Sequence, residues 1–125
     1  MSLTNLSLLS NVSYGVPSGN YDGTSSFFDG NAVPAVNYYA GQGSIQTVTV
    51  TLSNFSGNIT LQASLNDSSA TQVWFDAIDT SGNTTQTFSE STGTTSATYV
   101  GNFVWMRVKI TDFTAGNISN VVISY

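Results

Sequence analysis

Apolar and polar residues alternate with a period of two along several segments of this chain, which is the pattern of a half-buried β-strand. Residues 45–53 read IQTVTVTLS, so that the valines and the leucine share one face and the threonines share the other. Residues 58–65 (NITLQASL) and 103–111 (FVWMRVKIT) repeat the pattern. No window shows the 3.6-residue period of an amphipathic helix. The sequence therefore predicts an all-β fold.

Four further segments are rich in β-branched and aromatic residues and are also expected to be strands: 72–79, 84–90, 96–100 and 117–125. Segment 72–79 has apolar groups on both faces, which predicts a strand covered on both sides. Turn residues separate these segments at intervals of about 8–12 residues. A chain of 125 residues is one domain by the usual size relation. We expect an antiparallel β-sandwich, jelly-roll or immunoglobulin-like, of about 7–9 strands.

The first 44 residues follow a different pattern, in which glycines and prolines recur as turn signals. Residues 3–9 are compatible with an edge strand. Six aromatic residues lie between the turns and are candidates for an interface: Tyr14, Tyr21, Phe27, Phe28, Tyr38 and Tyr39. We therefore expect residues 1–44 to form an extended N-terminal arm and loops, and residues 45–125 to form the sandwich core. Such an arm would lie across a neighbouring subunit and pair with its backbone.

Two segments of the chain resemble each other. Residues 50–61 read VTLSNFSGNITL and residues 108–119 read VKITDFTAGNIS. Each has an apolar strand end, then Asn or Asp before Phe, then Gly-Asn-Ile, which predicts a β-hairpin with the Phe packed under the turn. A diverged duplication is the alternative explanation of the likeness.

Side chains that carry chemistry are scarce. The chain has no histidine and no cysteine, its one glutamate is Glu90, and its cations are Arg107 and Lys109. General acid–base and nucleophilic catalysis depend on such groups, so a non-enzymatic protein without a cofactor is expected. A net charge of −5 with two cations argues against nucleic acid as a partner. The chain has no long apolar run and no basic, apolar start typical of a secretory signal, so no membrane partner is expected.

The two cations lie on the same face of the strand predicted at 103–111. Phe103, Trp105, Arg107 and Lys109 alternate with apolar residues, which places aromatic and cationic groups side by side. Trp and Arg are enriched at interface hot spots, so we interpret this face as a protein interface. A solvated outer face with cation–π stacking is the alternative.

Aromatic residues also provide an alternative binding hypothesis. Trp74, Tyr99 and Trp105 are candidates for a sugar-stacking platform on the face of a sheet. Aromatic residues that fill the core or a subunit contact give the same pattern.

The carboxylates allow two further hypotheses. Asp76 and Asp79, followed by Thr-Ser-Gly-Asn, loosely resemble a calcium-binding loop, although the spacing is not that of an EF-hand. Asp and Asn at a turn also bind local backbone N–H groups, and we expect that role and no bound metal. Asp76 with Glu90 would serve as a glycosidase pair only if the two carboxyls flank a cleft.

The stretches NFVWMRVKITDFTAGNISNVVISY and VTVTLSNFSGNITLQASLNDSS resemble small β-rich virion structural proteins of marine tailed bacteriophages, especially cyanophages of the contractile-tail type. The resemblance covers about the C-terminal two-thirds of the chain. It implies a virion location, as an accessory or decoration subunit on the capsid, neck or tail. The implied partners are other virion proteins and copies of itself in a homo-oligomer. A carbohydrate-binding adhesin or fibre domain, with surface glycans as partners, is the alternative.

Overall fold

The computed structural model describes residues 5–35, 45–65 and 73–125, and these residues form strands, turns and irregular segments without a helix. No described helix is therefore long and apolar enough to cross a membrane. The seven strands are β1 (Asn5–Ser13), β2 (Phe28–Asp29), β3 (Val33–Pro34), β4 (Ile45–Ser64), β5 (Phe75–Asp76), β6 (Thr85–Val100) and β7 (Trp105–Ser124). All the strand pairs are antiparallel, so the all-β antiparallel fold predicted from the alternation is confirmed.

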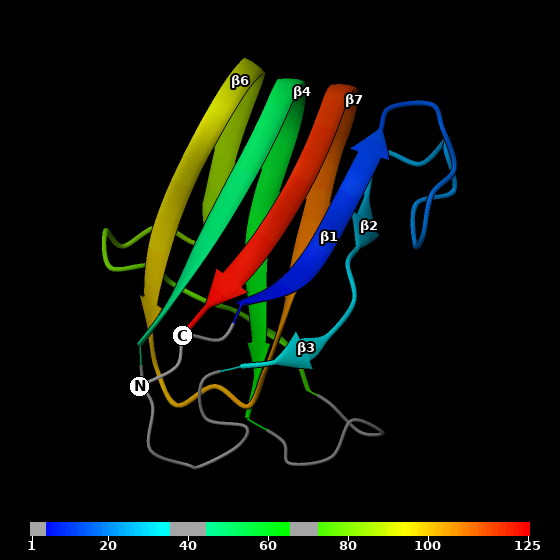
Figure 1. Cartoon of the computed structure of the whole chain (residues 1–125). Helices are drawn as coiled ribbons and strands as arrows, with labels where there is room; N and C mark the ends of the chain where they lie inside the picture. The colour runs from blue at the N-terminus through cyan, green and yellow to red at the C-terminus, as the bar shows by residue number, and fades with distance from the viewer. Residues whose placement is uncertain (1–4, 36–44, 66–72) are drawn as a thin grey trace.

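Three long strands each run through two layers (Figure 1). β4 pairs along its whole length with β6 on one side and β7 on the other, and all three bend over at the top of the view. We define the front layer as residues 5–13, 45–53, 93–100 and 117–124. The back layer is residues 58–64, 85–91 and 105–112, together with β2, β3 and β5. The result is a β-sandwich whose two layers are halves of the same strands.

The two similar segments form the corners of β4 and β7, not hairpins. The halves of β4 do not pair with each other, because each half continues the ladders to β6 and β7. The hairpin prediction is therefore wrong. The bend comes from single residues with positive φ, Asn54 at 52° and Asp112 at 51°, followed by a glycine in each segment. A short polar side chain tolerates this backbone conformation better than a β-branched one.

The phenylalanine of each corner is buried, as predicted. Phe55 is 0% exposed and Phe113 is 1% exposed, and their ring centroids lie 5.5 Å apart. Gly116 is required at the second corner because its φ is +92° and a Cβ there would collide with the carbonyl oxygen of Asn54. The likeness of the two segments thus reflects two equivalent corners that pack against each other.

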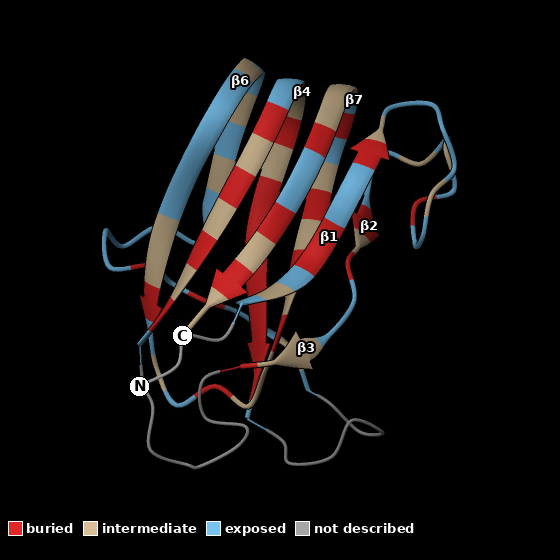
Figure 2. Cartoon of the chain, in the orientation of Figure 1, coloured by how far each residue is buried: buried red, intermediate tan, exposed pale blue. Residues whose placement is uncertain are grey.

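Buried residues alternate with intermediate ones along the first half of β4 and the beginning of β7, as the bands in Figure 2 show, whereas the last six residues of β4 are all buried. In the front layer the core side chains include Val48, Val50 and Ile123; in the back layer they include Leu61 and Val108. The period-two pattern therefore identified the core face of the front half of β4 and of β7, but not that of residues 58–65, where Thr60, Gln62 and Ser64 are also buried and Leu65 is exposed. Burial of the apolar core side chains is the main stabilising contribution expected for the sandwich.

Residues 5–35 lie against their own sandwich, which differs from the extended arm expected for residues 1–44. β1 pairs with the end of β7, and β2 and β3 pair with its beginning. Leu8 and Val12 are buried in the common core. The physical reason is that β7 leaves an edge open in both layers, and this segment covers it.

The predicted strand 72–79 is shorter than expected. Of the described residues 73–79, only Phe75 and Asp76 form a strand, β5, which pairs with the end of β4. Phe75 is 40% exposed and Ile78 is 57% exposed, so this segment is not covered on both sides. In this segment the apolar residues on both faces indicate exposed side chains, not a strand that is covered on both sides.

Candidate functional site

A row of hydrogen-bonded polar side chains crosses the outer face of the back layer. Strand register aligns Gln62 of β4 with Asp76 of β5 on one side and with Arg107 of β7 on the other. The Gln62 Nε2 donates to Asp76 Oδ1 at 3.1 Å, and the Arg107 Nε donates to Gln62 Oε1 at 2.8 Å. These two bonds fix the orientation of the Gln62 amide. Gln62 is 8% exposed, so the centre of this row of side chains is buried, where such hydrogen bonds are strong.

Arg107 has two further contacts at the same place. The Arg107 Nη1 lies 3.7 Å from Asp29 Oδ2 of β2, and its guanidinium carbon lies 4.5 Å from the centre of the Trp74 ring. A guanidinium over an indole face is a favourable cation–π arrangement. We call Trp74, Asp76, Gln62, Arg107 and Asp29 the Arg107 network. It joins residues from β5, β4, β7 and β2 into one preorganised surface.

A hollow of about 440 Å³ lies beside the Arg107 network. Its lining comes from the loop before β2, from β2 itself and from Arg107; the residues are Asn20, Asp22, Ser25, Phe27, Phe28, Asp29, Gly30 and Arg107. The volume falls within the roughly 300–1,000 Å³ of typical ligand sites. Phe27 is 66% exposed at its margin, so the hollow offers an apolar ring beside charged groups.

Hydrogen bonds within the loop give the hollow its shape. The Asp22 carboxylate accepts from the backbone N–H groups of Thr24 and Ser25 and from the Ser25 hydroxyl, at 2.7–2.9 Å. These bonds hold the pKa of the Asp22 carboxyl well below its usual value. The Asn20 amide donates to the Asp29 carbonyl oxygen at 3.0 Å. The loop is thus closed on itself and tied to β2.

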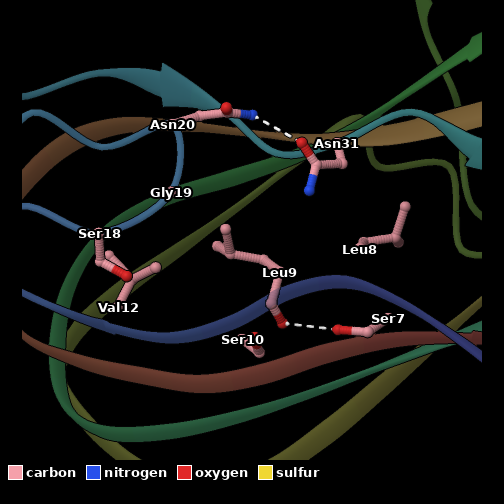
Figure 3. A pocket seen from close by; sticks show the side chains of 9 residues that line it. All are labelled: Ser7, Leu8, Leu9, Ser10, Val12, Ser18, Gly19, Asn20 and Asn31. Carbon is pink, nitrogen blue, oxygen red and sulfur yellow. Dashed lines mark hydrogen bonds between the residues drawn. The ribbon is translucent and has the colours of Figure 1, made fainter.

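A second pocket of about 280 Å³ lies between β1 and the loop that follows it (Figure 3). Its wall is made of leucines and serines of β1, and Asn20 donates to Asn31 Oδ1 at 3.1 Å across its far side. None of its lining residues is charged or aromatic. It lacks the mixture of groups found in the hollow beside Arg107.

The outer face of the front layer is an uncharged grid. None of the residues in its four strand segments is charged. Strand register arranges the outward side chains in three rows of four: Thr98, Thr47, Ser124 and Asn5; Ser96, Thr49, Val122 and Ser7; Thr94, Thr51, Asn120 and Ser10. Hydroxyl groups of neighbours in a row bond each other, Thr47 with Thr98 at 3.1 Å and Thr51 with Thr94 at 3.2 Å.

The face predicted for Phe103, Trp105, Arg107 and Lys109 is formed by the last three of these residues only. Trp105, Arg107 and Lys109 alternate with buried residues on the outer face of the back layer, as the sequence indicated. Phe103 departs from this face because it precedes β7 and is 8% exposed, with its ring edge-on to Phe75 at 5.9 Å. The Arg107 guanidinium stacks on the ring of Trp74, a residue that the strand pattern did not place beside it.

The predicted sugar-stacking set does not form one platform. Trp105 lies in the back layer and Trp74 stacks on Arg107 of that layer, but Tyr99 points into the core and is 2% exposed. Burial, with a smaller effect of the nearby Asp79, raises the pKa of the Tyr99 hydroxyl to about 12. The reason is register: Tyr99 pairs with the buried Gln46 on the inner face of the front layer.

The N-terminal aromatic residues predicted to form an interface differ in burial. Tyr21 and Phe28 are 1% and 7% exposed and pack on Phe113, so they are core residues and not the interface groups that the sequence indicated. Tyr14 is 50% exposed, and its ring lies edge-on to Phe113 at 5.4 Å. Phe27 is exposed at the hollow. Two further candidates, Tyr38 and Tyr39, lie outside the described residues.

The acidic residues Asp76, Asp79 and Glu90 take different positions and roles. Asp79 Oδ1 accepts from the backbone N–H groups of Ser81 and Asn83, which is the local turn role, while Asp76 binds Gln62. The described residues contain no group of three or more side chains suited to a metal. Glu90 lies at the corner of β6, five residues beyond the Thr85 that pairs with Thr60. At about 3.3 Å per residue it lies on the order of 16 Å up the strand, too far from Asp76 for a glycosidase pair.

Sequence reasoning missed Gln62, Asn20 and Asp29, which complete the site. Gln62 was an ordinary outward residue of an alternating strand, and Asn20 and Asp29 lay among turn residues. The pairing of β4 and β2 with β7 brings Gln62 and Asp29 to Arg107, and Asn20 follows through its bond to the Asp29 carbonyl oxygen. No local pattern reports such long-range register.

No family model matches this chain, and no curated protein matches its sequence. Similar solved structures exist. The SPBc2 prophage-derived protein YomS has a TM-score of 0.56 at 9% identity, covering 99% of this chain and 94% of that one. A chitosan-binding module of a chitosanase/glucanase from Paenibacillus sp. IK-5 has a TM-score of 0.50 at 18% identity, covering 98% and 92%.

The C-terminal carbohydrate-binding module of the laminarinase LamC from Zobellia galactanivorans has a TM-score of 0.50 at 8% identity, covering 99% of this chain and 100% of that module. At these identities the likeness concerns the fold, which is that of β-sandwich modules from phage-derived and carbohydrate-binding proteins. The predicted sandwich architecture is therefore confirmed.

Proposed function

We propose that this chain is a non-enzymatic structural subunit of a phage particle, an accessory or decoration protein of the capsid, neck or tail. Its contacts with copies of itself or with other virion proteins are made through the uncharged grid of the front layer. The observation that carries this proposal is the complete absence of charged residues from the four front-layer segments. Interface cores are depleted of charge in the same way.

Two further observations support a phage origin. The chain resembles small virion proteins of marine tailed phages through its corner segments and the strand at 103–111. The fold is shared with a prophage-derived protein at a TM-score of 0.56. The particular phage class, the contractile-tail cyanophages, follows from the sequence resemblance alone.

Light scattering and binding to purified particles test this function. The purified chain should form a defined oligomer or bind phage particles or their isolated capsid and tail components. A monomer without affinity for any virion component contradicts the proposal.

The Arg107 network favours a second candidate function, that of a carbohydrate-binding domain. Trp74 and the half-buried Trp105 lie on the same outer face as the polar groups of Gln62 and Arg107. Sugar sites combine such aromatic surfaces with a few fixed hydrogen-bonding groups. Two solved structures with this fold and a TM-score of 0.50 are described as a chitosan-binding and a carbohydrate-binding module.

A glycan array separates the two functions. A specific signal that disappears in Trp74→Ala or Trp105→Ala supports carbohydrate binding at this face. The matched variant Tyr14→Ala, which removes a half-exposed ring elsewhere, should keep the signal. Absence of any specific signal on the array contradicts the carbohydrate-binding function and does not affect the structural one.

A further inference from the structure

We propose that the hollow beside Arg107 binds one end of a neutral glycan, with Phe27 stacking on a pyranose ring and Asp29 and Arg107 binding two adjacent hydroxyls. This inference rests on the carbohydrate-binding candidate function and assigns its site. The site lies in the loop before β2 and differs from the tryptophan platform that the sequence indicated.

Phe27 is the first element of the argument. Its neighbour Phe28, the first residue of β2, points inward and packs on Tyr21 and Phe113, whereas Phe27 before β2 is exposed. The ring is 66% exposed at the margin of a hollow lined by polar groups. An exposed aromatic face beside hydrogen-bonding groups matches a sugar, which has an apolar C–H face and a rim of hydroxyls.

Asp29 and Arg107 supply the hydrogen bonds. Their charged atoms are 3.7 Å apart, which is longer than a hydrogen bond. Among the described residues the Asp29 carboxylate accepts no hydrogen bond, and Arg107 donates one, from Nε to Gln62. The remaining guanidinium donors and the carboxylate oxygens are therefore available side by side. A hydroxyl both donates and accepts, so two adjacent hydroxyls can donate to the Asp29 carboxylate and accept from the Arg107 guanidinium.

The charges of the hollow favour a neutral ligand. Asp29 is opposed by Arg107, and Lys109 is the register partner of Asp29 on β7. The carboxylate of Asp22 is already engaged by three hydrogen bonds within its own turn. A charged sugar would leave one of these balanced groups without its partner, and such imbalance costs affinity.

Backbone and side-chain bonds prepare the site before binding. Asn20 holds the Asp29 carbonyl oxygen, and Gln62 holds Arg107 at the opposite side. Gly30 also allows a close approach, because a Cβ there would collide with the carbonyl oxygen of Leu8 and with Val108. Preorganised groups lose little entropy when a ligand binds.

The test is an amide NMR titration of the full chain with the methyl glycosides of glucose, galactose and mannose. The methyl glycoside of glucuronic acid and glucosamine serve as charged comparators. We expect at least one neutral glycoside to shift the resonances of residues 20–30 and 105–109. Phe27→Ala and Asp29→Asn should each weaken this binding by about tenfold or more.

Two matched controls accompany these variants: Tyr14→Ala for the loss of an exposed ring and Glu90→Gln for the loss of an exposed carboxylate. Both should bind as the unchanged chain does. Shifts confined to the segment around Trp74 and Asp76 overturn the assignment of the hollow but keep the carbohydrate function. Preference for either charged comparator overturns the neutral class. Absence of binding by every sugar overturns both the hollow and the carbohydrate function, but not the virion role.

Discussion

The outer faces of the two layers are built from the same three strands and yet differ in chemistry. In the front layer β4 presents Thr47, Thr49 and Thr51, whereas in the back layer it presents Thr60 and Gln62 beside a guanidinium. β7 changes in the same way, from Arg107 and Lys109 to Asn120 and Ser124. In β7 the cations lie only before the corner, and β4 adds polar but uncharged groups to the same back face. The corners therefore do more than close the sandwich, because they separate an uncharged face from a charged one.

The largest expected effect comes from the ring cluster that joins the corners. Phe113 is 1% exposed and contacts Tyr14, Tyr21, Phe28 and Phe55. Phe113→Ala should lower the free energy of unfolding by about 3–5 kcal/mol, because it leaves a cavity between both layers. Urea denaturation measures this. Phe27→Ala, which removes an exposed ring, should change stability by about 0.5 kcal/mol or less; equal losses would show that the corner is not the shared support of the two faces.

The corner backbone gives the next largest effect. Gly116→Ala should destabilise the fold by about 2–3 kcal/mol, because the residue has a positive φ and its Cβ would collide with the Asn54 carbonyl oxygen. Gly82→Ala is the matched control: its φ is +87°, but a Cβ there meets nothing within 4 Å. Its expected cost is about 1 kcal/mol. Thermal unfolding of the two variants compares them, and similar melting temperatures would contradict the tight corner.

The alternation of residues predicted the architecture well, and long-range pairing explains what it did not predict. The inward residues of 45–53 and of 106–110 were correct because period two is a local property, whereas Phe103, before β7 begins, is buried and did not follow the pattern. The corners were interpreted as hairpins because Asn-Phe-Ser-Gly has the residues of a turn, and the sequence does not say whether the chain then reverses against itself or crosses to another layer.

The candidate site was predicted in part for the same reason. Trp74, Arg107 and Phe27 were recognised from their residue types, but their partners Gln62 and Asp29 depend on register between segments far apart in sequence. Tyr99 was assigned to a binding platform, although its strand turns it into the core. One residue of shift along a strand decides between these outcomes.

The pH dependence of stability distinguishes the inner side of the front layer. The pKa of Tyr99 is about 12 in the folded chain, against about 10 for an unperturbed tyrosine. The unfolded chain therefore loses this proton first, and stability should fall as the pH rises from about 10 to about 12. Below pH 10 the contribution is fully present. Urea denaturation across this range should give a smaller slope for Tyr99→Phe; an unchanged slope would mean that Tyr99 is not buried.

Arg107→Lys keeps the charge of the back face but removes the Nε bond to Gln62 and the planar contact with Trp74. We expect a loss of about 1–2 kcal/mol of stability, measured by urea denaturation with tryptophan fluorescence. Lys109→Gln removes the other cation, which has no described hydrogen bond, and should cost about 0.5 kcal/mol or less. If the order of the two variants is reversed, the Arg107 network does not hold this face together.

Placing one positive charge on each face tests the central claim most directly. Thr49 and Thr87 are outward residues of the front and back layers, and neither substitution touches the core. Light scattering and particle binding should show that Thr49→Lys abolishes assembly while Thr87→Lys assembles as the unchanged chain does. If Thr87→Lys is the variant that fails, or if both assemble normally, the front grid is not the surface through which this protein binds its partners.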